Sequence, residues 1–161
     1  MSYEVNDIIT EISGLLEKLG SKFDIKREND SCVIIHNPHT DRNLTLEITK
    51  SDVLSEMTLY FAEQHWHYGF DRLPELLETI RAIIENKIGD GEVYLSEERR
   101  HSFGGNVYRA DIESKPYAEC FGSIMSGYVD EQCRKNGAEI RFKFWDPQYD
   151  KTVIIEKGSA L

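Results

Sequence analysis

The spacing of apolar residues changes along this chain between the period of a helix and the period of a strand. Residues 5–19 place their apolar side chains three and four positions apart, which predicts a helix with one buried face. Alternating segments follow up to residue 68, a second helical pattern covers about 71–84, and alternation then returns. Segments with these two periods must bury their apolar faces against each other, so this order predicts an α+β fold.

The expected architecture is an antiparallel sheet of about six to eight strands with two helices packed on one face. After a turn at 88–91, the alternation resumes, and residues 114–137 show only a helical turn near 130–135. We expect strands at 23–26, 32–36, 44–49, 56–68, 92–96 and 103–113, and a C-terminal hairpin over 140–155. No linker rich in Pro, Gly or Ser divides the 161 residues, so we expect a single α+β domain over 1–161.

The chain is acidic, with 29 Asp and Glu against 19 Lys and Arg and a formal charge of −10. Residues 51–90 hold half of that charge, with 8 acidic and 3 basic residues. A surface of this sign repels phosphate backbones, so we expect no nucleic-acid binding. It attracts a basic protein partner, although solubility alone is the alternative explanation.

The expected location is the cytoplasm. No apolar run approaches the roughly 20 residues that a membrane-spanning helix needs, so we expect no membrane partner. The first residues are polar and acidic, without the pattern of a signal peptide. The three cysteines form no C-x-x-C pair, which favours free thiols over a disulfide framework, and Cys32 begins an apolar run that predicts a core position.

Residues 56–69 combine more chemically active side chains than any other segment. On a continuous strand over 56–68, alternation places Glu63, His65 and His67 on one face. Imidazole nitrogens and a carboxylate are ligands for Zn²⁺, Mn²⁺ or Fe²⁺, so this row offers three ligands to one ion. We expect no cofactor, and a Zn²⁺ site on this row is the alternative prediction. A further ligand would come from His36, His39, Asp71 or His101.

Two alternatives explain the same residues without a metal. A β-bulge near Gln64 would shift the register, turn Trp66 toward the core and expose both histidines. Pairing of Glu63 with one histidine at the end of the strand would also account for the row.

The other face of this strand and the helix after it combine aromatic with acidic residues. Aromatic anchors beside a charged rim are typical of protein interfaces. We therefore expect a partner-binding face made of Tyr60, Trp66, Tyr68, Asp71, Glu75 and Glu78. The alternative is that the aromatic rings pack under a helix.

No motif in the sequence predicts catalysis. The chain lacks a G-x-S-x-G nucleophile elbow and the glycine-rich loops that hold nucleotide phosphates. The sequence therefore favours a non-enzymatic binding protein for a basic protein partner over an enzyme. A metal-binding protein or metal-dependent enzyme built on Glu63, His65 and His67 is the alternative.

The segment Leu59–Tyr68, with its H-x-H spacing and the acidic helix that follows, resembles a block in small uncharacterised bacterial proteins. Some of those proteins are similar to immunity proteins of bacterial toxin systems. The resemblance covers about thirty residues, Glu56 to Glu85. It implies a cytosolic protein that binds and blocks a toxin without catalysis.

A second resemblance concerns the architecture. The element order and the acidity are similar to those of type III secretion chaperones, which are acidic homodimers that bind a segment of an effector. The C-terminal hairpin departs from that pattern, because those chaperones end on a helix. This resemblance implies a homodimer as a further alternative.

Overall fold

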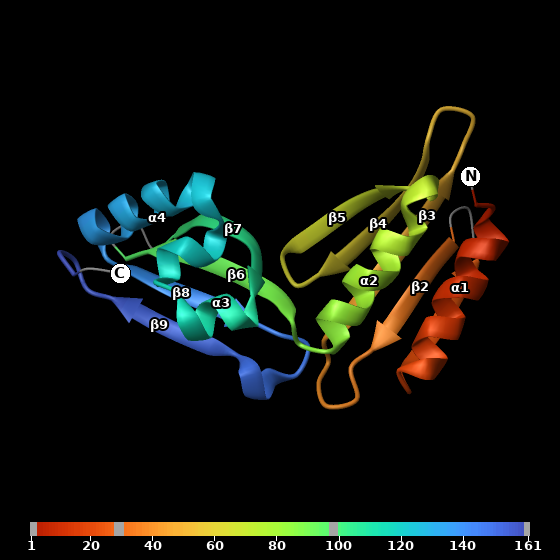
Figure 1. Ribbon diagram of the computed structural model, residues 1–161, viewed down its shortest axis with the longest axis horizontal. Helices are drawn as coiled ribbons and strands as arrows, with labels where there is room; N and C mark the ends of the chain where they lie inside the picture. The colour runs from red at the N-terminus through yellow and green to blue at the C-terminus, as the bar shows by residue number, and fades with distance from the viewer. Residues whose placement is uncertain (1–2, 28–30, 97–99, 160–161) are drawn as a thin grey trace. The chain divides into compact units, whose positions relative to one another are not determined.

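The structure is a computed structural model that describes residues 3–27, 31–96 and 100–159 (Figure 1). The chain divides into two compact units, residues 1–84 (the N-terminal unit) and residues 85–161 (the C-terminal unit). This division describes packing and is no test of independent folding, so the expectation of a single domain stays a prediction.

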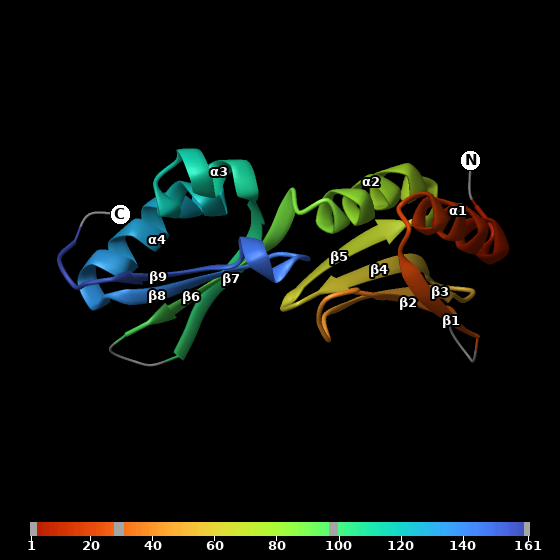
Figure 2. The ribbon, with the colours of Figure 1, turned by 90° about the horizontal axis from the view of Figure 1, so that it is seen from below.

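The N-terminal unit is a five-stranded antiparallel sheet in the sequential order β1-β2-β3-β4-β5, with two helices. Its elements are α1 (Val5–Lys18), β1 (Lys22–Arg27), β2 (Ser31–His36), β3 (Asn43–Lys50), β4 (Ser55–Phe61), β5 (Gln64–Gly69), the 3₁₀ helix η1 (Phe70–Arg72) and α2 (Leu73–Ile84). Figure 2 shows both helices on one face of the sheet.

The core of this unit lies between that sheet face and the apolar stripes of the helices. Strand β3 alternates buried and exposed positions, as the sequence predicted for a half-buried strand. The largest fully buried side chains come from both layers and include Ile8, Ile12, Leu16, Ile35, Leu44, Leu46, Ile48, Met57, Leu59 and Phe61.

A tight turn at Ala62 and Glu63 divides the segment that we predicted as one strand. β4 and β5 pair antiparallel on either side of it, with Phe61 opposite Gln64. Ala62 has a φ of 50°, a left-handed backbone conformation that helps the chain to reverse. The prediction of a continuous strand over 56–68 is therefore wrong, and the side chains after the turn follow a new alternation.

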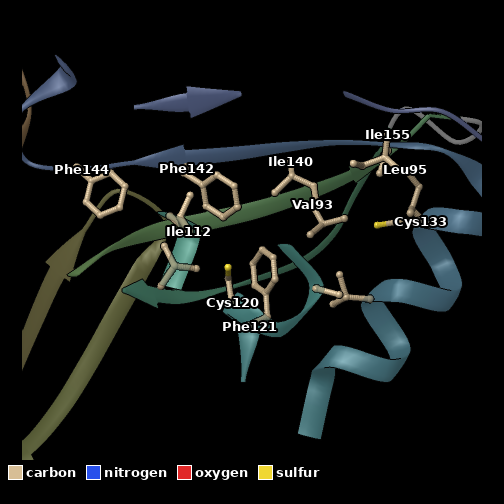
Figure 3. Packing of buried hydrophobic residues seen from close by; sticks show 14 residues of the cluster. Val93, Leu95, Ile112, Cys120, Phe121, Cys133, Ile140, Phe142, Phe144 and Ile155 are labelled. Carbon is tan, nitrogen blue, oxygen red and sulfur yellow. The ribbon is translucent and has the colours of Figure 1, made fainter. Parts of the chain in front are cut away.

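The C-terminal unit is a four-stranded antiparallel sheet in the order β7-β6-β8-β9. Its elements are β6 (Ile88–Leu95), β7 (Arg100–Tyr108), α3 (Arg109–Ser114), the 3₁₀ helix η2 (Tyr117–Phe121), α4 (Ser123–Asn136), β8 (Ala138–Lys143), the 3₁₀ helix η3 (Pro147–Tyr149) and β9 (Lys151–Ile155). Its core packs one sheet face against η2 and α4 (Figure 3). The rings of Phe121 and Phe142 stack there with centroids 6.2 Å apart.

Gly89 and Gly91 lie inside β6, although their sequence predicted a turn. A Cβ atom at Gly89 would lie 2.5 Å from the carbonyl oxygen of Lys143, and one at Gly91 would lie 2.7 Å from Val107 Cγ1. Both distances are too short for a real contact. These glycines therefore mark the close approach of neighbouring groups and not a chain reversal.

The predicted α+β class is confirmed, whereas the expected architecture is only roughly matched. The structure has two antiparallel sheets with nine strands in total and four α-helices within the described residues, not one sheet with two helices. The strand predicted over 103–113 ends at Tyr108, where α3 begins. Of helix α4 only a turn near 130–135 was predicted, because its sequence is mostly polar; among its described side chains Val129 and Cys133 are buried.

Candidate functional site

The second face of the N-terminal sheet carries acidic, aromatic and imidazole side chains. Both α1 and α2 pack on the first face, and no helix of the N-terminal unit's described residues covers the second (Figure 2). Because strand side chains alternate, the neighbours of buried Met57, Leu59 and Phe61 point to this second face.

Six residues of strands β3, β4 and β5 form a connected group on this face, which we call the hairpin patch. Its members are Glu47, Glu56, Thr58, Tyr60, His65 and His67. The register of the sheet brings them together. Thr58 lies opposite both Glu47 and His67, and Tyr60 lies opposite His65.

Hydrogen bonds hold the two carboxylates of the hairpin patch in place. Glu56 Oε1 accepts a hydrogen bond from Thr58 Oγ1 at 3.0 Å and forms another with His67 Nδ1. The Tyr60 hydroxyl donates to Glu47 Oε2 at 3.2 Å. The patch therefore presents oriented acceptors, which lose less freedom on binding a partner than mobile side chains do.

Aromatic rings lie beside these carboxylates. The ring centroids of Tyr60 and His65 are 6.0 Å apart, and those of His65 and His67 are 5.0 Å apart in an edge-to-face arrangement. Tyr60 is 37% exposed. An incoming side chain would thus meet ring faces and carboxylate oxygens together.

The electrostatics of the patch follow from these contacts. The hydrogen bond with His67 holds the pKa of Glu56 below its usual range, and the bond from Thr58 acts in the same direction. Desolvation raises the pKa of Tyr60, and the hydrogen bond with Glu47 adds to that effect. Glu56 is therefore an anion over the physiological pH range.

Cys32 borders the hairpin patch on strand β2, opposite Glu47. Its neighbour Val33 points into the core, so the Cys32 side chain points to the second sheet face and is half-buried. The core position predicted for Cys32 is therefore wrong. Desolvation raises the pKa of its thiol, and the Glu47 carboxylate raises it further.

The six residues predicted as a binding face lie in three different places. Tyr60 belongs to the exposed sheet face, whereas the turn at Ala62 directs Trp66 and Tyr68 to the face that the helices cover. Tyr68 is only 7% exposed, and its hydroxyl lies 2.7 Å from Thr79 Oγ1 of α2. The aromatic row therefore does not exist as one surface, because the hairpin reverses the alternation.

The acidic members of that predicted face, Asp71, Glu75 and Glu78, are exposed on η1 and α2. Arg72 forms an ion pair with Glu75, and Arg81 forms one with Glu78 at 2.9 Å. Each arginine neutralises a glutamate three residues away. The outer surface of α2 is therefore less acidic than its glutamate content suggested.

The predicted metal ligands are also separated. Glu63 lies in the turn, whereas His65 and His67 lie on strand β5. No group of three or more His, Cys, Asp or Glu among the described residues has the arrangement to hold a metal ion. Of the suggested further ligands, His36 is hydrogen-bonded to Asp24 at 2.8 Å, and the side chain of His101 lies outside the described residues. Metal binding by Glu63, His65 and His67 stays a prediction.

Sequence reasoning missed Glu47, Glu56 and Thr58. Their strands were expected, but only the register of β3 on β4 and of β4 on β5 brings them to the histidines. A predicted turn at Ala62 would have placed Thr58 opposite His67. Glu56, two residues before Thr58, would then have been expected on the same sheet face.

The described residues of this unit also form a groove of about 470 Å³ between α1 and α2. It is lined by Thr10, Glu11, Gly14, Leu15 and Lys18 of α1 and by Pro74, Leu77, Glu78 and Arg81 of α2. One predicted binding residue, Glu78, belongs to it.

Comparisons with known proteins give no relative for this chain. It matches no protein-family model, no curated protein and no solved structure. Among the described helices, none has the length and apolarity to cross a membrane.

Proposed function

We propose that this chain is a non-enzymatic binding protein that engages a basic protein partner through the hairpin patch. One observation carries the proposal. On the sheet face that α1 and α2 do not cover, hydrogen bonds hold the Glu47 carboxylate at the Tyr60 hydroxyl and the Glu56 carboxylate at the His67 ring.

An arginine side chain is complementary to this arrangement. Its guanidinium donates charge-assisted hydrogen bonds to carboxylates, and its flat face stacks on aromatic rings. The charge of the unit supports a basic partner, because residues 1–84 contain 15 acidic and 8 basic residues, a net −7 of the total −10. A field of this sign speeds association with a positively charged surface.

The resemblance to immunity-type bacterial proteins extends the proposal to a class of partner. In that form, the chain acts in the cytoplasm and blocks a basic toxin. The alternative of a secretion-chaperone-like homodimer shares the acidic surface but requires two copies of the chain.

A binding titration with an Arg₉ peptide tests the hairpin patch. We expect the double variant Glu47→Gln/Glu56→Gln to bind the peptide at least about tenfold more weakly than the original chain, because two oriented charge-assisted acceptors are lost. The matched control is Glu17→Gln/Glu63→Gln, which removes the same charge from exposed positions outside the patch. Isothermal titration calorimetry at 150 mM salt measures both.

The control separates a defined site from a general charge effect. An equal loss of affinity in both double variants would show that only net charge matters, and the proposal would be rejected. Unchanged affinity in Glu47→Gln/Glu56→Gln would reject it as well. Circular dichroism on each variant confirms that the fold is intact.

A further inference from the structure

The two helices of the N-terminal unit run in the same direction. All neighbouring strands are antiparallel, so β1 and β5 point the same way in the five-stranded sheet. The chain reverses after α1 to enter β1, and it reverses again through η1 to leave β5 for α2. Figure 1 shows α1 and α2 side by side in this parallel arrangement.

The groove between these helices is open at its centre. A Cβ atom added at Gly14 would find no other atom within 4 Å, so the backbone of α1 is accessible there. Leu15 and Leu77 line the groove on either side of this point. Another helix can therefore approach α1 closely at Gly14, as small residues at helix crossings permit.

Two charges on α1 flank this central point. Glu11 and Lys18 are seven residues apart, which places them on the same helix face about 10 Å from each other along the axis. Both line the groove, and both are exposed. Neither has an ion-pair partner among the described residues, whereas Glu78 and Arg81 of α2 pair with each other.

This pattern is complementary to itself. A two-fold axis that crosses the helices at right angles beside Gly14 would place α1 antiparallel to α1 of a second copy. Glu11 of each chain would then face Lys18 of the other, and the two Gly14 positions would meet at the crossing. A parallel arrangement would instead oppose like charges, which is unfavourable.

We propose that the chain forms a two-fold symmetric dimer in which the α1–α2 groove of one copy receives the same surface of a second copy. The interface is isologous, so each contact occurs twice. It lies on the helix side of the N-terminal unit, opposite the hairpin patch. The dimer therefore goes beyond the proposed binding function, and either proposal can fail without the other.

Charge-reversal variants test whether Glu11 of one copy contacts Lys18 of the other. In Glu11→Lys, two lysine side chains face each other at each contact, and in Lys18→Glu two glutamate side chains do. We therefore expect each single variant to weaken dimerisation at least about tenfold. An equimolar mixture of the two variants restores both opposite-charge contacts and is expected to form the mixed dimer. With one variant labelled with ¹⁵N, native mass spectrometry distinguishes the mixed dimer by its mass, and light scattering gives the dissociation constants.

The control for these variants is Glu17→Lys, which makes the same charge change on α1 outside the groove. It is expected to dimerise like the original chain. A second, uncharged test is Gly14→Met, which favours the helix but fills the crossing point. At concentrations where the chain is monomeric, we expect this variant to have a higher melting temperature than the original chain. We also expect it to weaken the dimer.

Any one of the following results would overturn the proposal. The original chain could remain monomeric at 100 μM, the single variants could dimerise normally, or their mixture could stay monomeric while each is folded by circular dichroism. Binding of a different protein helix by a monomeric chain would assign the groove to another occupant and would also overturn it.

Discussion

At the scale of single residues, the hairpin patch shows how a carboxylate on a sheet surface becomes a fixed feature. Glu56 lies two positions from Thr58 on β4, and His67 is opposite Thr58 on β5, so three side chains meet on one sheet face. Glu56 is hydrogen-bonded to both Thr58 and His67, and Thr58 Oγ1 also lies 3.3 Å from His67 Nδ1. The geometry therefore stabilises the ionised form of Glu56 in the folded state.

The pH dependence of stability should report this stabilisation. The lowered pKa of Glu56 in the folded state means that its contribution is fully present above the unfolded value of 4.5 and is lost as the pH falls through the folded value. The difference in unfolding free energy between the original chain and Glu56→Gln should thus shrink from pH 6 to pH 3. We expect it to be below about 1 kcal/mol at pH 6, as for partly exposed pairs.

Urea unfolding at several pH values gives this difference. Glu63→Gln is the control, since it removes the same charge from an exposed position in the turn, outside the contacts of Glu56 with Thr58 and His67. A difference for Glu56→Gln that did not decrease toward pH 3 would contradict the assigned hydrogen bonds.

At the scale of elements, the β4–β5 hairpin decides which side chains share a surface. Strand side chains alternate with a period of two, so a reversal of the chain at Ala62 resets the alternation. Trp66 and Tyr68 thereby move to the helix-covered side, and the histidines move to the exposed side. Ala62, at the turn, has a positive φ, which is sterically unfavourable for a residue with a Cβ atom.

Ala62→Gly should therefore stabilise the chain by about 0.5–1 kcal/mol, because glycine adopts a positive φ without the steric cost that Ala pays. The matched control is Ala82→Gly within α2, where the same substitution should destabilise by about 1 kcal/mol. Chemical denaturation measures both. A destabilising effect of the same size at both positions would show that Ala62 is not in the left-handed region.

At the scale of the whole molecule, each unit has a hydrophobic core of its own. The core of the C-terminal unit comes from β6, β7, α3, η2, α4, β8 and β9. The buried residues of α1 and α2 lie on the same side of the five-stranded sheet as those of its strands. A unit that buries its apolar faces within itself meets the first requirement of an independent fold.

A fragment of residues 1–84 is therefore expected to keep a dispersed NMR spectrum and to unfold cooperatively. This result would overturn the prediction of a single domain over 1–161, whereas an unfolded fragment would support that prediction. A fragment lacking α1, residues 21–84, is the control, because loss of Ile8, Ile12 and Leu16 should prevent folding.

The sequence by itself determined the class of fold and the elements with strong periodicity. Helix α1, strand β3 and helix α2 lie where their apolar spacing predicted them, because one-sided burial imposes a period that local sequence reveals. Of helix α4 only a turn near 130–135 was predicted, since its mostly polar sequence gives almost no period.

The tertiary structure alone decided which residues form the candidate site. A turn with no glycine or proline, at Ala62 and Glu63, carries little local signal, yet it reverses the strand and separates Glu63 from the histidines. Glu47 joins the site only through the register between β3 and β4, and register depends on contacts between strands that are distant in sequence. The strands of a site can thus be predicted from local pattern, but their mutual alignment is fixed only when the sheet assembles.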